Sequence, residues 1–67
     1  MGYNKPVKAT DELQVTIINL GERGDGIAEV DKFIIIVPET QLDKTYKIRI
    51  KKVFPKYAIA QSIEEVA

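Results

Sequence analysis

Alternation of apolar and polar residues is clearest in the second half of the chain. Residues 44–53 hold two interleaved series, an apolar one of Tyr46, Ile48 and Ile50 and a basic one of Lys47, Arg49 and Lys51. Because successive side chains of a strand point to opposite faces, this period of two predicts a strand with one buried and one basic face. Residues 57–63 predict a further strand, whose Ala58 and Ala60 suit the tapered interior of a small barrel.

Three more strands are expected in the first half of the chain, spanning Leu13–Ile18, Gly26–Val30 and Phe33–Val37. Asp31 and Lys32 can form a two-residue hairpin turn between the second and third of these strands. Pro38 has no amide hydrogen to donate, so it ends the third strand. The segment 39–43 is too short for a helix and is expected to be a loop, and residues 54–56 are expected to form a turn.

The segment Gly21–Gly26 contains three glycines in six residues, which is typical of a tight turn that needs positive φ angles. It lacks the spacing of a dinucleotide-binding loop, and no helix follows whose N-terminus could bind phosphate. Turn formation is therefore the favoured interpretation. Arg23 near the tip is either a contact for a backbone phosphate or an ordinary solvated arginine, and the residues alone leave both open.

Five short strands without helical periodicity predict an all-β fold, either a sandwich or a closed barrel. The inward apolar positions are too few for two sheets to share, and closure removes exposed strand edges. A small five-stranded β-barrel is therefore expected. Residues 1–10 show no periodicity and are expected to form a flexible N-terminal arm before a domain of residues 11–67.

The composition excludes several kinds of chemistry. The chain has no cysteine and no histidine, which removes disulfides, thiolate metal sites and the commonest general base. Ser62 is the single serine and has no histidine to activate it, and the acidic residues lack the spacing of a calcium-binding loop. We expect no catalytic residue, metal, cofactor or small-molecule substrate. The longest apolar run, Phe33–Val37, is too short to span a bilayer, so a cytoplasmic protein without a membrane partner is expected.

Charge is unevenly distributed along a chain whose net charge is zero. Residues 1–43 carry eight acidic and four basic residues. Residues 44–63 carry no acidic residue and six basic ones: Lys44, Lys47, Arg49, Lys51, Lys52 and Lys56. In physiological salt, dissolved ions screen the interaction between exposed charges that are more than about 8 Å apart. The second half of the chain can therefore present a positive surface although the net charge is zero.

Aromatic residues beside these lysines favour a nucleic-acid partner. A row of lysines alone is as typical of a solvated barrel face as of a phosphate-binding one. Phe54 and Tyr57 flank the turn after the basic strand, and aromatic rings can stack on any base, each stack contributing roughly 1–3 kcal/mol. Phe33 has the parity of a core residue but lies beside a turn, so its place stays open, whereas Tyr46 is expected in the core.

Two ordered signatures resemble the TRAM domain family. The first is Gly21–Ala28 followed by Phe33 and Val37–Pro38, and the second is the aromatic–alanine–apolar–alanine pattern that ends Val53–Ala60. The resemblance covers about residues 9–66. It implies an OB-like five-stranded barrel that binds RNA, a module attached to enzymes that methylate or methylthiolate RNA and also present alone in small archaeal proteins.

The resemblance also implies a function and a set of residues. Standalone members resemble cold-shock proteins and act as RNA chaperones, which implies binding of single-stranded RNA or tRNA with little base preference. By this resemblance, base stacking would fall to Phe33 and Tyr57 and a basic contact to Lys56, and Arg23 matches the glycine-loop position. Together with the residues of the basic strand and the turns, the candidate RNA-binding residues are Arg23, Lys32, Phe33, Lys47, Arg49, Lys51, Lys52, Phe54, Lys56 and Tyr57. A monomer is expected. The chain departs from the family pattern at four positions. Glu29 replaces a basic residue, Lys32 replaces the usual turn glycine, and Ile36 and Ile59 replace frequent aromatic residues.

Two other functions stay open. An acidic surface could make the barrel a protein–protein adaptor, and its residues would be Glu12, Glu22, Asp25, Glu29 and Asp31. The chain could instead be the RNA-substrate-binding domain of a larger RNA-modifying enzyme, although its start at Met1 and its acidic end favour a complete chain. Salt dependence separates RNA binding from the adaptor function, because phosphate contacts weaken steeply with salt.

Overall fold

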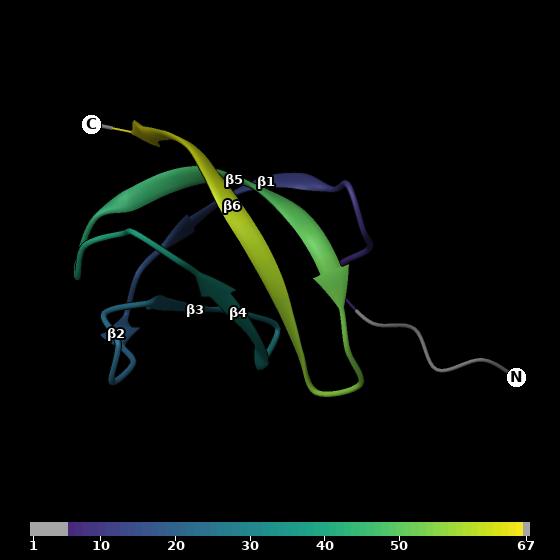
Figure 1. Ribbon diagram of the computed structural model, residues 1–67. Coiled ribbons are helices and arrows are strands. Elements are labelled where there is room, and N and C mark those ends of the chain that lie inside the picture. Colours follow the sequence, from purple (N-terminus) through teal and green to yellow (C-terminus); the bar gives the residue numbers. More distant parts are fainter. Residues whose placement is uncertain (1–5, 67) are drawn as a thin grey trace, which may run out of the picture.

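The computed structural model describes residues 6–66, which form six β-strands and contain no helix, and so none that could cross a membrane (Figure 1). The strands are β1 (Glu12–Thr16), β2 (Asn19–Leu20), β3 (Gly26–Val30), β4 (Phe33–Val37), β5 (Thr45–Val53) and β6 (Tyr57–Val66). The all-β class is confirmed, and β3 and β4 have the expected limits. β5 begins at Thr45 instead of Lys44, and β6 runs on to Val66 instead of ending at Ile63.

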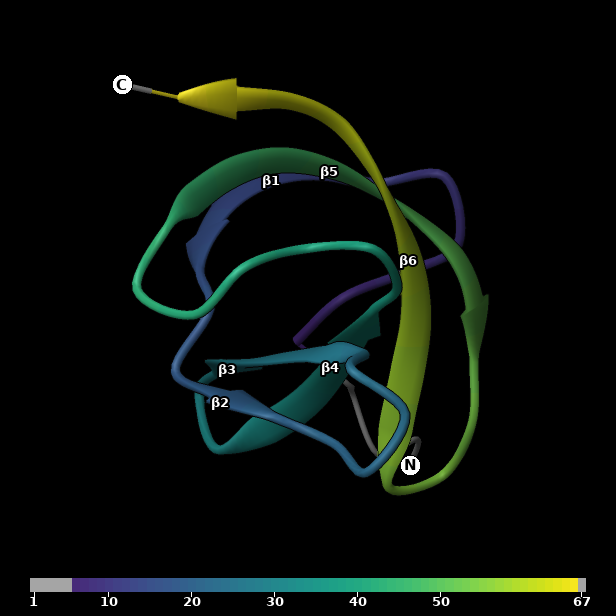
Figure 2. The same ribbon diagram turned by 60° about the vertical axis from the view of Figure 1, so that its left-hand side comes forward.

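All six strands belong to one sheet, in the order β1–β5–β6–β4–β3–β2. Neighbouring strands are antiparallel except β4 and β6, which run parallel. The sheet is strongly curled into a half-barrel, and its two edges are β1 and β2 (Figure 2). The curl brings the inner faces of the strands around one hydrophobic core.

The first expected strand is divided in two, so the sheet has six strands and not five. β1 pairs with β5, whereas β2 pairs with β3. The change of partner occurs between two isoleucines: the Ile17 amide donates to the Lys44 carbonyl over 2.9 Å, and the Ile18 amide donates to the Ile27 carbonyl over 2.8 Å. Side-chain alternation could not reveal this division, because Ile17 is buried and Ile18 exposed just as in an uninterrupted strand.

The buried positions of β5 and β6 follow the predicted alternation. They are Tyr46, Ile48 and Ile50 in β5 and Ala58 and Ala60 in β6. Tyr46 lies in the core as expected, and its hydroxyl accepts a hydrogen bond from the Gln41 amide over 2.9 Å. A buried phenol needs such a partner, because an unsatisfied polar group costs free energy away from water.

The N-terminal segment contributes one core residue that the sequence pattern did not indicate. Val7 is 3% exposed and packs in the core cluster. The Thr10 amide donates to the Ile50 carbonyl over 2.7 Å, so this segment is attached to β5. A single valine among polar residues has no periodic neighbours and therefore gives no strand signal. Residues 1–5 of the expected arm lie outside the described residues.

Two bulges interrupt the pairing of β5 with β6. The register shifts between Ile50 and Lys52 and again between Lys47 and Ile48. At the first shift, Lys51 and Lys52 are both exposed, and Val53 packs against the core. Because a bulge inserts one extra residue into one strand, two adjacent lysines face solvent where strict alternation would turn one of them inward.

The three glycines of residues 21–26 serve different purposes: Gly21 and Gly24 lie in the loop between β2 and β3, and Gly26 begins β3. Of these three, Gly24 alone has a positive φ, of 84°. Gly26 has no room for a side chain, because a Cβ atom there would overlap Thr40 Oγ1 and lie 3.1 Å from Ile17. The expectation of positive φ angles therefore holds for one glycine of the loop, and close packing accounts for Gly26.

The connection between β3 and β4 is the expected two-residue turn. Val30 pairs with Phe33, and Asp31 and Lys32 have φ angles of 52° and 69°. A left-handed conformation costs a side-chain-bearing residue roughly 1–2 kcal/mol, although aspartate and asparagine tolerate it better than lysine does. The turn is thus formed at the cost of strain at Lys32.

We expect Lys32→Gly to raise the free energy of unfolding by about 0.5–1 kcal/mol. Glycine adopts the left-handed conformation without steric strain, and its greater freedom in the unfolded chain offsets part of the gain. Urea denaturation of the variant and the wild type measures the difference. Asp31→Gly is the matched control and should gain less. A Lys32→Gly variant no more stable than the wild type would contradict this account of the turn.

Candidate nucleic-acid interface

The turn between β5 and β6 brings two aromatic rings and an ammonium group together. The rings of Phe54 and Tyr57 stack, with centroids 4.7 Å apart and planes 20° apart. Lys52 Nζ lies 5.4 Å from the centroid of the Phe54 ring, within the range of cation–π attraction. The Phe54 amide donates to the Tyr57 carbonyl over 2.7 Å, so the hairpin backbone itself holds the two rings side by side.

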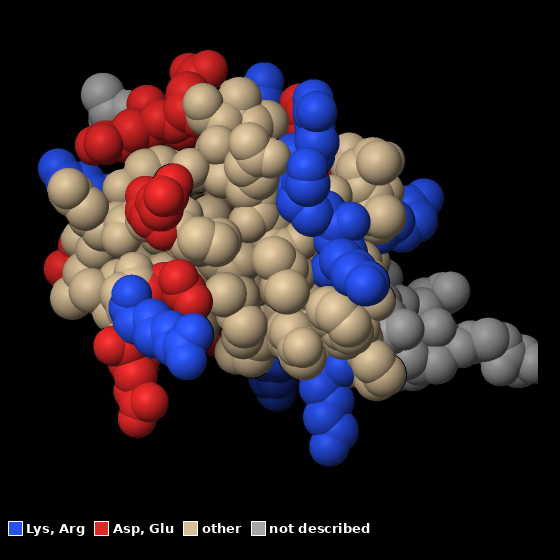
Figure 3. All heavy atoms as spheres, viewed as in Figure 1, with Lys and Arg blue, Asp and Glu red and all other residues tan. Residues whose placement is uncertain are grey.

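Exposed lysines accompany this stacked pair. Lys51, Lys52 and Lys56 are all exposed, and none of the three forms an ion pair with another residue of the described range 6–66. Basic side chains run down the right-hand side of Figure 3, over β5 and its turn into β6. We call the set formed by Lys51, Lys52, Phe54, Lys56 and Tyr57 the hairpin cluster.

Two further candidate cations lie at opposite ends of β3. Because β4 and β6 are parallel and Ile34 pairs with Tyr57, the turn that holds Lys32 lies at the same end of this pair as the hairpin cluster. Arg23 lies in the loop between β2 and β3, away from the hairpin in Figure 1. The structure thus brings Lys32, but not Arg23, to the end of the sheet that carries the cluster.

Lys47 and Arg49 lie on the outer face of β5 and are paired with one carboxylate. Arg49 Nε donates to Glu12 Oε2 over 3.0 Å, and Arg49 Nη2 donates to the same oxygen. Lys47 Nζ lies 3.8 Å from Glu12 Oε1. The hydrogen bond from Arg49, followed by the positive charges of Arg49 and Lys47, holds the pKa of the Glu12 carboxyl below its usual range. Sequence reasoning missed this pairing.

Phe33 is a core residue, which answers the question that the sequence left open. It is 6% exposed and packs in the core cluster. A ring so deeply buried offers almost no face to a base, so the stacking role expected for Phe33 is at odds with its burial. Its parity within β4 was the informative signal, and its place beside a turn was misleading.

An apolar strip that sequence reasoning overlooked continues from the hairpin cluster across the outer face of the sheet. Ile34 pairs with Tyr57, and Ile36 pairs with Ile59 on one side and Ile27 on the other. The four isoleucines are half-buried. Ile34 and Ile36 alternate with the buried core positions of β4. A continuous apolar run such as residues 33–37 hides this alternation in the sequence.

The five acidic residues considered for an adaptor surface do not form one patch. Glu22 and Asp25 lie in the loop between β2 and β3, whereas Asp31 lies in the turn at the other end of β3. Glu29 is exposed on β3 itself. Glu12 lies on β1, where its carboxylate is paired with Lys47 and Arg49 of β5. Acidic side chains gather elsewhere, at the upper left of Figure 3, where β6 ends.

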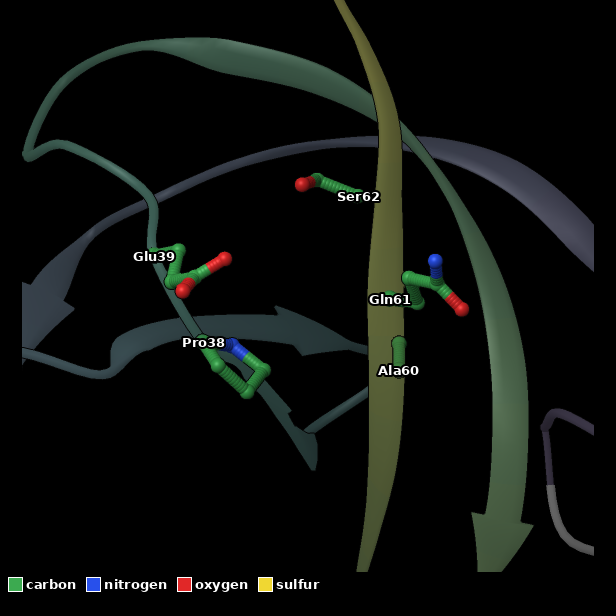
Figure 4. A pocket seen from close by; sticks show the side chains of 5 residues that line it. All are labelled: Pro38, Glu39, Ala60, Gln61 and Ser62. Atoms are coloured by element: carbon green, nitrogen blue, oxygen red, sulfur yellow. The ribbon is translucent and has the colours of Figure 1, made fainter.

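An open depression of about 400 Å³ lies where β4 and β6 separate (Figure 4). Its lining residues are Pro38, Glu39, Ala60, Gln61 and Ser62. Pairing of the two strands stops at Ile36 and Ile59, and the side chains of Glu39 and Ser62 extend into the gap beyond, while that of Gln61 points away. The lining holds no cation and no aromatic ring, so the depression is not part of the hairpin cluster.

Comparison with known proteins places this chain in a family. The family model described as the TRAM domain matches residues 6–63. The uncharacterized protein MJ0660 of Methanocaldococcus jannaschii is 45% identical over 60 residues, which cover 90% of this chain and 78% of that protein. The solution structure of the conserved protein MMP0076 of Methanococcus maripaludis matches with a TM-score of 0.85 at 37% identity, covering 90% of this chain and 86% of the other.

A similar segment also occurs inside a much longer enzyme. Ribosomal RNA large subunit methyltransferase E of Haloarcula marismortui is 41% identical over 59 residues, which cover 88% of this chain but only 22% of the enzyme. The family match takes up nearly all of the 67 residues and leaves no room within them for a catalytic domain. The chain therefore belongs to the TRAM domain family, whose members are RNA-binding modules found in RNA methyltransferases and as standalone proteins.

Proposed function

We propose that this TRAM domain binds single-stranded RNA or tRNA without catalysing a reaction, and that the hairpin cluster is the centre of its binding surface. The observation that carries the proposal is the stacked pair of Phe54 and Tyr57 with three exposed lysines beside it. Rings stack on any base through its π-face, and lysines bind phosphates as point charges. Little base preference is therefore expected.

The contacts within the cluster suggest a different role for each ring. Phe54 has the Tyr57 ring and the Lys52 ammonium group close to it, whereas Tyr57 makes an aromatic or cation contact only with Phe54 within residues 6–66. Tyr57 therefore supplies the ring face for a base, and Phe54 supports it from behind. Lys51, Lys52 and Lys56 contact the phosphates. Lys32 lies at the end of the sheet that carries the hairpin cluster and can contact a further phosphate.

We also propose that β1 and β2 act together as one strand of an OB-like five-stranded barrel. Two residues separate them, and they pair with β5 and β3 respectively, the neighbours that such a strand would need to close the curled sheet. The hydrogen bonds of Ile17 and Ile18 continue both pairings across the break. Closure of this kind leaves the outer face of β3, β4 and β6 open to RNA.

The activity that follows from such binding is that of an RNA chaperone. A protein that binds the open form of an RNA but not its duplex shifts the folding equilibrium towards the open form by mass action. No hydrolysis or cofactor is needed for this step. Weak contacts without base preference are compatible with chaperone activity, because the protein must also dissociate from the RNA.

One observation favours a second function. The likeness to a segment of an rRNA methyltransferase suggests a domain that holds RNA for a catalytic unit. The same hairpin cluster would then serve as a substrate-binding surface. The adaptor function gains no such support, because its acidic residues are scattered over the molecule.

Fluorescence anisotropy of a labelled, unstructured RNA decamer tests the proposed function. Each phosphate contact to a single strand contributes about −0.7 to the slope of log K against log salt concentration. Three or four contacts then predict an affinity roughly 20- to 50-fold lower at 200 mM than at 50 mM salt. A hairpin RNA of the same length is the control and should bind more weakly. Absence of binding at 50 mM salt, or equal binding of the hairpin, would overturn the proposal.

A further inference from the structure

The sheet itself places Glu12 against the basic strand. Glu12 of β1 is directly opposite Arg49 of β5, and the next residue but one, Gln14, is opposite Lys47. The backbone is held just before this point, because the Ile50 amide donates to the Asp11 carbonyl over 2.8 Å. The carboxylate is therefore positioned by paired strands rather than by a loop.

The geometry around Glu12 is that of an occupied anion site. One carboxylate oxygen accepts two hydrogen bonds from the Arg49 guanidinium group, and the other faces the Lys47 ammonium group at 3.8 Å. Phosphate oxygens are bound by arginine and lysine in the same manner. The side chains of Lys47, Arg49 and Glu12 are 48%, 54% and 37% exposed, so a phosphate can reach the cations without any movement of the strands.

The basic strand thus consists of two parts that differ in charge. Lys47 and Arg49 share the carboxylate of Glu12, which offsets one of their two positive charges, whereas Lys51 and Lys52 form no ion pair with any other residue in 6–66. Lys51 is two positions after Arg49, with Ile50 between them, which corresponds to about 6.6 Å along a strand. An RNA strand that binds the hairpin cluster can therefore extend directly onto the part of β5 that is paired with Glu12.

We propose that Lys47 and Arg49 form a second phosphate subsite for RNA, which the Glu12 carboxylate occupies in the RNA-free protein. This inference rests on the proposed function. A phosphate must displace the carboxylate to enter, so the subsite adds little to RNA affinity as long as Glu12 is present. An exposed ion pair contributes little to stability, so removing the carboxylate leaves the fold intact. Glu12 therefore limits the footprint of RNA to the hairpin cluster.

The test compares RNA binding by the wild type, Glu12→Gln and the matched control Glu65→Gln over a range of salt concentrations. Glu65 lies 3.7 Å from Lys44 in a similarly exposed pair, and its removal changes the net charge equally. Two additional phosphate contacts should steepen the salt slope of Glu12→Gln by about 1.4 and raise its affinity at low salt on the order of fivefold. Glu65→Gln should match the wild type.

A triple variant tests whether the gain in RNA affinity of Glu12→Gln depends on Lys47 and Arg49. Adding Lys47→Gln and Arg49→Gln to Glu12→Gln should remove the extra slope and the extra affinity. Thermal unfolding of each variant verifies that it is folded, and Glu12→Thr serves as a second removal of the carboxylate should Glu12→Gln prove unstable.

Each outcome separates the subsite from the proposed function. If the wild type binds RNA and neither Glu12→Gln nor Glu12→Thr steepens the salt slope, the second subsite is disproved while the RNA-binding function stands. A gain of equal size in Glu65→Gln would likewise disprove it, because the effect would then be one of net charge. If none of the variants binds RNA at low salt, the proposed function itself fails.

Discussion

Gly26→Ala is expected to lower the free energy of unfolding by about 2–3 kcal/mol, the largest effect on stability that we predict for a small substitution. The added methyl group would overlap Thr40 Oγ1, whose hydroxyl is buried and donates to the Val37 carbonyl over 2.8 Å. Overpacking of a core costs typically 1–3 kcal/mol, and a disturbed buried hydrogen bond adds to this. For a domain of this size the melting temperature should fall by roughly 10–20 °C, measured by circular dichroism.

The backbone around Gly26 cannot relieve the overlap. Gly26 pairs with Leu20 on one side and with Val37 on the other, so both neighbouring strands hold its position. Removing the opposing hydroxyl should relieve part of the overlap instead. We expect the effects of Gly26→Ala and Thr40→Ala to be non-additive, with the double variant less destabilised than the sum of the two single variants.

The two glycines of the preceding loop, Gly21 and Gly24, are the matched controls. Gly24→Ala should cost about 1 kcal/mol, because a Cβ atom there has open space but φ is 84°. Gly21→Ala should be nearly neutral, since its added Cβ atom would make an ordinary 3.7 Å contact with the Asp25 carbonyl oxygen. If Gly26→Ala proved as mild as Gly21→Ala, the close approach to Thr40 would not be the reason for glycine at this position.

Tyr57→Ala is expected to weaken binding of an unstructured RNA roughly 5- to 150-fold at low salt, the largest effect on binding that we predict for a single substitution. Loss of one base stack costs roughly 1–3 kcal/mol, which corresponds to this range of affinity. Fluorescence anisotropy measures the change. Because the Tyr57 ring also supports that of Phe54, the substitution disturbs both rings of the cluster.

Two comparison variants distinguish stacking from charge. Tyr57→Leu keeps an apolar side chain without a ring and should lose most of the same affinity. Lys56→Gln keeps the ring and should instead reduce the salt slope by about 0.7, the value of one phosphate contact. Thermal unfolding of each variant separates loss of binding from loss of fold. RNA affinity unaltered in Tyr57→Ala would show that Tyr57 does not stack on a base.

Much of the candidate site could be recognised from the sequence because its residues are close together in the chain. Lys51, Lys52, Phe54, Lys56 and Tyr57 fall within seven consecutive residues around one turn. The turn brings them together whatever the rest of the sheet does. Phe33 is different, because its exposure depends on whether β4 packs its face against a core, and the structure buries it.

The sequence by itself determined the features that depend on near neighbours. The parity of Tyr46, Ile48 and Ile50 selects the buried face of β5, and the missing amide hydrogen of Pro38 ends β4. Asp31 and Lys32 make the turn between two paired strands. Steric limits and hydrogen-bonding capacity act over a few residues here, so the pattern was sufficient.

Only the tertiary structure decided which distant residues face one another. Glu12 and Arg49 are 37 residues apart, and their pairing follows from the register of β1 against β5. The division of the first strand and the bulge that exposes Lys52 also arise from pairing between strands. Register depends on how the whole sheet curls around its core, and alternation within one strand carries no information about that curl.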